Sequence, residues 1–408
     1  MKQMRSASRS RWTHVGSRLL PFIAIMATVV ISAALGSSII VWNWPDIGVP
    51  LWGDRLAIVR DIGVFAGAAF ALLFAGWRGW AADRQAIAAR DRADTAQRVL
   101  LNDRYQQSAE MLGSNVIAVR LGGIYALVHL AAEYSSDYHI QVMRLLCTFA
   151  RERKNGLIGH EEESIADLST TVPHPPDEVQ AIVWAIGDRS DDQRDLERNT
   201  AERFEVDLDG LYFAGGNAEG TDLSGINLQR AQLSMANLAQ VDLSGTQLQY
   251  SILIGAFLAE ANLFQTRLWH ADMRAAALPG ANLWAAELLS TNLVAANMRG
   301  AELWSTDLSA ADLRNADLSY TELVMTDLSD TNLAGVDFSG AKMNGAILLN
   351  ANLSGAHFSR FGSRPVTGLT QRQLDQAVAD HDDPPHLVSV TDAVTGRTLE
   401  WKSGPSSS

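Results

Sequence analysis

A five-residue repeat constrains this chain more than any other feature. It runs from 206 to 360, thirty-one times, without an insertion or a deletion. The central apolar residue of each unit, here called the hub, falls at Leu208 and at every fifth position to Phe358, and twenty-four of the thirty-one hubs are Leu. The residue two before each hub is nearly always small or β-branched, and twenty-four of these thirty-one are Ala or Thr.

A period of five fits neither a helix nor a strand, because their apolar residues recur about every 3.6 and every two positions. Short self-similar units instead stack as a solenoid in which each unit buries its apolar face against its neighbours. We therefore expect the hub and the small residue two before it to point inward. The residue before the hub, here called the pre-hub residue, is usually polar and is expected to face water. Gly two after the hub, as at Gly225 and Gly340, suits a tight turn.

The pattern of Ala, then Asp or Asn, then Leu, then two variable residues resembles the pentapeptide-repeat proteins, and it covers about 155 residues here. The resemblance implies a mainly β fold, a right-handed quadrilateral β-helix with four pentapeptides per coil. Thirty-one units then make almost eight coils. The alternative is a disordered low-complexity tract, which the regular hydrophobic pattern argues against.

The N-terminal part of the chain predicts a membrane anchor. Five cations and no acidic residue precede an uncharged apolar run over 19–42, and a second apolar run follows over about 56–77. Two spans with basic flanks predict a hairpin whose two ends are both cytoplasmic. The expected location is the bacterial inner membrane, with the lipid bilayer contacted through two spans. The rival interpretation is a signal peptide cleaved near Ala34.

Helical segments are expected between the anchor and the repeats and again after them. The segment 120–127 resembles one often found beside pentapeptide repeats in membrane-anchored bacterial proteins. Thr370 and Gln373 form a capping box for a helix to about Ala379. In relatives this end can pair two rods, so a homo-oligomer is possible. The expected organisation is a basic N-terminus (1–18), a transmembrane hairpin (19–77), a helical region (78–153), a linker and N-terminal cap (154–205), the β-helix (206–360), and a C-terminal cap helix with a polar tail (361–408).

The composition and motifs of the sequence argue against an enzyme. The single cysteine, Cys147, excludes an internal disulfide, and no phosphate loop, catalytic triad or metal-ligand spacing is present. We therefore expect a non-enzyme without cofactor or metal. A net charge of −13 argues against a general nucleic-acid partner.

Two surface features remain as candidate sites. Phe264, Trp284 and Trp304 each follow a hub at intervals of twenty residues, so four units per coil would stack them in one column, with Trp269 on the adjoining face. These four residues, here called the aromatic stripe, predict a protein-binding surface. In the alternative interpretation the rings pack against the N-terminal helices.

The second feature is an acidic girdle of six consecutive pre-hub residues. Some pentapeptide-repeat proteins are thought to imitate DNA and bind gyrase through an acidic rod. A solvated face required for solubility is the simpler interpretation. The girdle consists of Glu302, Asp307, Asp312, Asp317, Glu322 and Asp327.

The preferred function is a membrane-anchored scaffold that presents a rigid cytoplasmic β-helix to an unknown protein partner. One alternative is a DNA mimic that binds a DNA-handling enzyme such as a topoisomerase. A second is a membrane sensor or channel-like assembly, which rests on Arg60 and Asp61 and on small-residue pairs in the spans.

Overall fold

The computed structural model describes residues 52–153, 174–200, 204–360 and 363–402. The expected first span, 19–42, lies outside these residues. The chain divides into two compact units, Met1–Leu100 and Leu101–Ser408, which are described separately.

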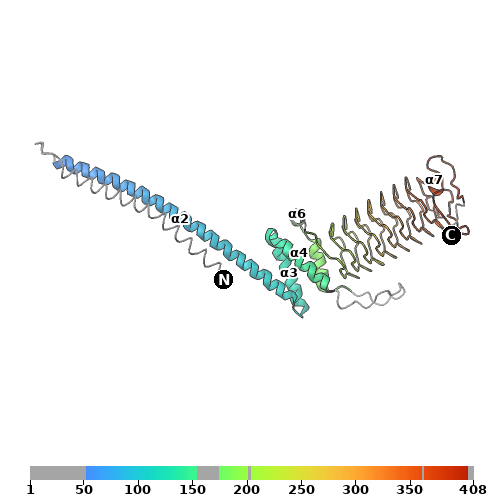
Figure 1. Cartoon of the computed structure of the whole chain (residues 1–408), viewed down its shortest axis with the longest axis horizontal. Coiled ribbons are helices and arrows are strands. Elements are labelled where there is room, and N and C mark those ends of the chain that lie inside the picture. Colours follow the sequence, from blue (N-terminus) through green and yellow to red (C-terminus); the bar gives the residue numbers. More distant parts are fainter. Residues whose placement is uncertain (1–51, 154–173, 201–203, 361–362, 403–408) are drawn as a thin grey trace. The chain divides into compact units, whose positions relative to one another are not determined.

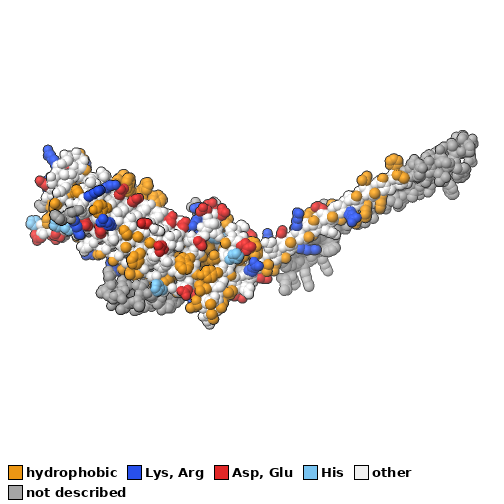
Figure 2. Space-filling model, turned by 180° about the vertical axis from the view of Figure 1, so that it is seen from behind, with side chains coloured by type: hydrophobic (Ala, Val, Ile, Leu, Met, Phe, Trp, Pro, Cys, Tyr) orange, Lys and Arg blue, Asp and Glu red, His pale blue; other side chains and the backbone are white. Residues whose placement is uncertain are grey.

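The helix α2 (Trp52–Leu112) is continuous over 61 residues. The expected second span, 56–77, and the Ala-rich segment after it therefore form one element rather than two. By length and composition, Gly63–Leu112 is the one helix among the described residues that could cross a membrane, and its most apolar window has a mean hydropathy of 1.3. Hydrophobic and arginine side chains both lie on its surface (Figure 2). The described residues thus contain one apolar helix where the sequence analysis expects two spans.

The repeats form stacked coils of twenty residues, four pentapeptides to a coil (Figure 1). Each pre-hub residue makes a parallel β-bridge with the residue twenty positions later, beginning with Asp207 and Asn227 and ending with Asp337 and His357. Each of the four sides of the rod is therefore a narrow parallel sheet that extends from one end of the rod to the other. This confirms the expected quadrilateral β-helix.

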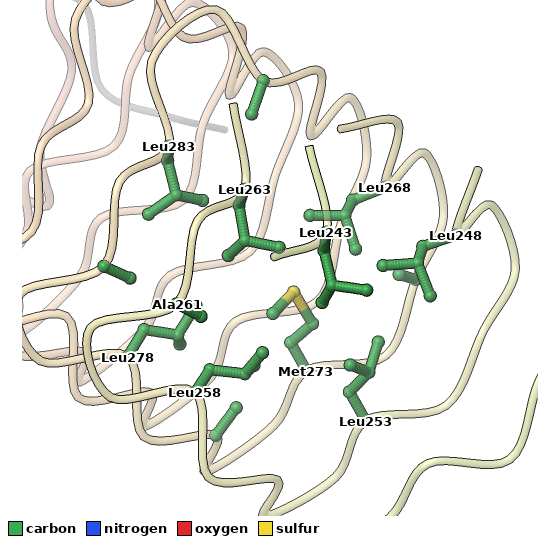
Figure 3. Packing of buried hydrophobic residues seen from close by; sticks show 14 of the residues in the cluster. Leu243, Leu248, Leu253, Leu258, Ala261, Leu263, Leu268, Met273, Leu278 and Leu283 are labelled. Carbon is green, nitrogen blue, oxygen red and sulfur yellow. The ribbon is translucent and has the colours of Figure 1, made fainter. Parts of the chain in front are cut away.

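The interior of the β-helix is dry. Hubs from all four sides point toward one another, and the small residues two before them fill the corners (Figure 3). Leu293, Leu313 and Leu333, which share one side, are each fully buried. Six buried Thr hydroxyls at corner positions donate to hub carbonyls 23 residues earlier, as Thr306 does to Leu283 at 2.7 Å. No buried hydroxyl among these six is left without an acceptor.

Backbone hydrogen bonds explain the period of five. In each unit two N–H groups donate to the next coil, one donates to the previous coil, and one closes a turn onto the hub carbonyl. The N–H directly after the hub has no backbone acceptor, and where the pre-hub residue is Asp or Asn its side chain accepts this N–H instead. The five bonds of the unit 282–286 run from Asn282 N to Ala261 O (2.9 Å), Leu283 N to Glu302 O (2.8 Å), Trp284 N to Asn282 Oδ1 (3.0 Å), Ala285 N to Trp304 O (2.9 Å) and Ala286 N to Leu283 O (3.0 Å).

This local bond gives the pre-hub residue a structural role beyond facing water. All eighteen Asp and Asn residues at this position accept the N–H two residues later. Short carboxylate and amide side chains suit this turn because they reach their own backbone. The one Pro in the repeats, Pro279, lies at the position that this bond would serve, and its pre-hub residue is Ala277. Since Pro has no N–H, that unit needs no acceptor.

The corner two residues after each hub from Leu208 to Leu353 has a positive φ, which explains the frequent Gly there. Some large side chains at this corner are matched by Gly in the next coil, whereas Tyr250 instead stacks on His270. Tyr320 lies over Gly340, where a Cβ atom would be only 2.8 Å from the ring. The identity of the corner residue therefore depends on its neighbour twenty positions away.

Among the described residues, four helices lie between α2 and the β-helix: α3 (Ile117–Glu133), α4 (Ser135–Glu152), α5 (Asp177–Gly187) and α6 (Asp191–Asn199). Their core is continuous with the interior of the rod. Both α5 and α6 lie in the segment 154–205, which the sequence analysis expects to be a linker and N-terminal cap. Ser190 and Gln193 form a capping box that starts α6, and Gln193 and Glu197 are buried, so polar residues rather than apolar ones attach this helix.

Buried charges hold these helices together. Arg120 on α3 is 8 % exposed and Glu178 on α5 is 2 % exposed; Arg120 Nε donates to Glu178 Oε1 at 2.5 Å. Glu197 on α6 pairs with His139 Nε2 at 2.7 Å and with Arg189 Nη1 at 2.8 Å. Each acid therefore links helices that are distant in the sequence.

The helices also cover the first coil. The side chain of Gln180 pairs with the backbone of Asn217 as a neighbouring strand would: Nε2 donates to Asn217 O at 2.5 Å and Oε1 accepts Asn217 N–H at 2.9 Å. Arg194 pairs with Asp222 at 2.6 Å on the next side of the coil. The exposed edge of the solenoid is therefore closed by side chains from α5 and α6.

The C-terminal end is covered by α7 (Gln371–Leu374) and the chain around it (Figure 1). The expected capping box of Thr370 and Gln373 is confirmed, but the helix ends five residues before Ala379. Val378 instead bridges to Asn352 on the last coil. The chain after the repeats thus adds irregular strand pairings to the open edge, and this competes with a longer helix.

Replacing Asn292 by Ala should lower the free energy of unfolding by about 1 kcal/mol, because Val294 N–H loses its acceptor. Urea denaturation of the full chain measures this change, and Asn292→Asp, which keeps the acceptor, should change stability less. As a matched control, Ala277→Asn should bring no gain because residue 279 is Pro. A clear stabilisation by Ala277→Asn would contradict the assigned role of the pre-hub residue.

Removing one partner of the buried pair should destabilise the helices more than removing both. Glu178→Leu leaves Arg120 buried and unpaired and should cost about 3–5 kcal/mol, whereas the double variant Glu178→Leu with Arg120→Met should recover most of that loss. Denaturation monitored by the helical circular dichroism signal gives the free energies of unfolding of the parent chain, the two single variants and the double variant. Additive effects would show that the pair is not coupled.

Candidate functional site

The aromatic column forms as the repeat predicts. Phe264 and Trp284 meet edge to face with ring centroids 6.0 Å apart, and Trp284 and Trp304 are tilted with centroids 6.4 Å apart. Each ring directly follows a hub on the same side of the coil, so the inter-coil bridges place it above the previous one. Aromatic contacts of this kind stabilise their neighbours by about 0.5–1.5 kcal/mol, so the column is a preformed surface.

The column is exposed. Trp284 keeps 51 % of its surface accessible and Trp304 keeps 42 %, while Phe264 is half-buried. The described helices contact the first coil around Asn217 and Asp222, well before the column begins. Within the described residues, these helices therefore do not cover the rings, contrary to the alternative interpretation.

The adjoining face widens this surface. Trp269 and Leu289 are each 38 % exposed, five residues after Phe264 and Trp284. Met325, at the corner after the column, is 66 % exposed and was not predicted as part of the site. The repeat could have indicated Met325, because it lies two coils after Ala285 and therefore at the same corner beside the column. Hydrophobic, acidic and basic side chains are mixed over the face of the β-helix seen in Figure 2.

One indole of the stripe is held in place by charge. Trp304 Nε1 donates to Glu322 Oε2 at 2.7 Å, and Lys342 Nζ donates to Glu322 Oε1 at 2.5 Å. Hydrogen bonds from Lys342 and then Trp304 lower the pKa of Glu322. Glu322 therefore stays ionised and fixes the orientation of Trp304 at neutral pH.

The acidic girdle is largely engaged with its own chain. Asp307, Asp317 and Asp327 each accept the N–H two residues later, and Asp312 does so as well while pairing with Arg314 at 2.7 Å. Glu322 is bonded as described above. Among the described residues Glu302 is the one girdle member whose side chain has no hydrogen bond or ion pair. The girdle is thus first a structural feature of the turns.

The remaining reactive groups are placed for structure. A cavity of about 250 Å³ lies between α4 and the start of the β-helix and is lined by residues that include Cys147, Arg151 and Asp207. Burial raises the pKa of the Cys147 thiol to about 12, so it is protonated at neutral pH. Within the described ranges no three His, Cys, Asp or Glu side chains converge on a possible metal position.

Comparison with known proteins identifies the repeat. A family model described as pentapeptide repeats matches eight copies between residues 207 and 360. No curated protein matches the chain.

Solved structures of the same repeat type are similar to the rod. HetL of the cyanobacterium Nostoc sp. strain PCC 7120, described as involved in regulation of heterocyst differentiation, is 27 % identical over 47 % of this chain and 91 % of its own, with a TM-score of 0.33. Rfr23 of the cyanobacterium Cyanothece 51142 is 31 % identical over 28 % of this chain and 89 % of its own, with a TM-score of 0.21. QnrB1, a plasmid-mediated fluoroquinolone resistance protein, is 20 % identical over 41 % and 92 %, with a TM-score of 0.25.

Eight matched copies, the twenty-residue coils and the buried hubs agree on one assignment: the chain belongs to the pentapeptide-repeat family.

Proposed function

We propose that this protein is a non-catalytic, membrane-anchored scaffold that presents its β-helix to a protein partner through the aromatic stripe. The observation that carries the proposal is the column of Phe264, Trp284 and Trp304, which is stacked in place and yet exposed. Large aromatic side chains at such positions dominate the binding energy of protein interfaces. Because the rod is fixed by bonds between coils, the surface loses little conformational entropy when a partner binds.

Membrane anchoring is the second part of the proposal. The apolar start of α2 supports it, since Phe65 is 77 % exposed and Leu72 is 76 % exposed. Large apolar side chains that are exposed within the described part of the chain suit lipid better than water. With the uncharged run at 19–42 as a second span, the rod would lie on the cytoplasmic side of a bacterial inner membrane.

The DNA-mimic alternative has less support. A mimic needs carboxylates that are free to imitate phosphates, whereas Asp307, Asp312, Asp317 and Asp327 bond to their own turns. A supercoiling assay with a bacterial topoisomerase separates the two functions. Inhibition by the purified protein that survives Trp284→Ala would favour the mimic.

The stripe is tested by recovering partners of the full-length protein from mild detergent. Trp284→Ala and Trp304→Ala should each reduce recovery of the partner at least tenfold, because truncation of a central aromatic residue costs about 2 kcal/mol or more. Phe257→Ala is the matched control, since Phe257 is 49 % exposed on a different side of the coil. If the stripe variants recover the same proteins as the parent, the proposed site is wrong.

The membrane topology is tested with reporter fusions. A fluorescent protein at the C-terminus should fold and fluoresce, and alkaline phosphatase at the same place should be inactive, because the rod is expected in the cytoplasm. Phosphatase fused after Pro50, between the expected spans, should be active. Recovery of the full-length protein in the soluble fraction, or an active C-terminal phosphatase, would exclude this topology.

A further inference from the structure

We propose that the aromatic stripe binds an amphipathic α-helix of a partner protein whose Arg or Lys side chains pair with Glu287 and Glu302. This inference rests on the proposed function and names the chemistry of the partner.

Two carboxylates beside Trp284 lack partners within the described residues. The side-chain carboxylates of Glu287, which is half-buried, and Glu302, which is exposed, have no hydrogen bond or ion pair among the described residues. Glu322 one coil later differs, because Trp304 and Lys342 both bond to it. Two carboxylates without a side-chain partner thus lie on the two sides of the rod that flank the most exposed ring of the column.

The repeat places Glu302 relative to Trp284 as it places Glu322 relative to Trp304. In the second pair the carboxylate is within 2.7 Å of the indole nitrogen. Glu302 therefore takes the same place in the repeat relative to Trp284, without a bond to that indole, and Glu287 lies three residues beyond Trp284, across the coil corner. A guanidinium or ammonium group placed on Trp284 would contact an aromatic face with a carboxylate on either side.

The surrounding charges favour a basic partner. In the pre-hub column of Glu287, Asp307 and Asp327 follow in the later coils, and the single cation Arg267 precedes it in the coil before. Lys342, beyond the far end of the stripe, is already paired with Glu322. An acidic segment would meet like charges on both sides of the rings, while a basic one would meet opposite charges.

The backbone excludes strand addition. The N–H of Trp284 donates to Asn282 Oδ1 at 3.0 Å, and the N–H of Ala285 donates to Trp304 O at 2.9 Å. With its N–H groups occupied in this way, the stripe offers side chains rather than an open sheet edge. A helix matches the spacing of those side chains, because its turns rise by about 5.4 Å and adjacent coils are about 4.8 Å apart. From Phe264 to Val324, about three turns of helix would fit.

Two labelled synthetic peptides test the inference against the full-length protein in detergent. Both carry Leu at helical spacing over about three turns; one has Arg and the other Glu at the flanking positions. By fluorescence anisotropy the Arg peptide should bind at least tenfold more tightly than the Glu peptide. The double variant Glu287→Gln with Glu302→Gln should weaken the Arg peptide about fivefold, while Glu260→Gln, an exposed acid elsewhere on the rod, should not.

A third peptide with a central Pro, which blocks the helix, should lose binding. Equal affinities for the Arg and Glu peptides, failure of both to bind, or no effect of the double variant would overturn the inference. Those results leave the proposed function standing if Trp284→Ala still reduces recovery of the partner. If that variant changes nothing either, the proposed function fails as well.

Discussion

The structure depends on how each five-residue unit satisfies its own backbone. Four of the five N–H groups find carbonyl acceptors through coil stacking and the turn, and the fifth relies on a side chain one position before the hub. A buried or half-buried N–H without an acceptor costs about 1–3 kcal/mol. Repeated over thirty-one units, that constraint selects Asp or Asn before most hubs and leaves the rod with a fixed geometry.

Because the β-helix has a fixed geometry, the position of each exterior side chain can be predicted from the sequence. Because coils bridge at intervals of twenty residues, side chains far apart in the chain become neighbours at known positions. The stacking of Phe264 on Trp284 and the bond from Trp304 to Glu322 both follow from this interval. Energetically the surface is prepared in advance, so a partner need not order it.

The same interval explains what the sequence alone could predict. The coils, the buried hubs and the aromatic column follow from local spacing, which the chain states thirty-one times. The helix α6 could not be read in this way, since it is attached by Glu197 bonded to His139 and Arg189, residues with no repeating pattern. The end of α7 was missed because Val378 joins the last coil through a pairing of irregular length. Sequence spacing also indicated carboxylates around the rod but not which of them, such as Glu302, would be left unbonded.

The β-helix can gain or lose length without redirecting its surface only in steps of one twenty-residue coil. Removing twenty residues between the helices and Phe264 would shift the aromatic stripe along the axis by about 4.8 Å without turning it. Removing five residues would move every later side chain to the neighbouring side of the rod, so that the stripe would point in a different direction relative to the helical cap. Evolution can therefore alter the reach of this surface in whole coils, while a single unit gained or lost redirects it.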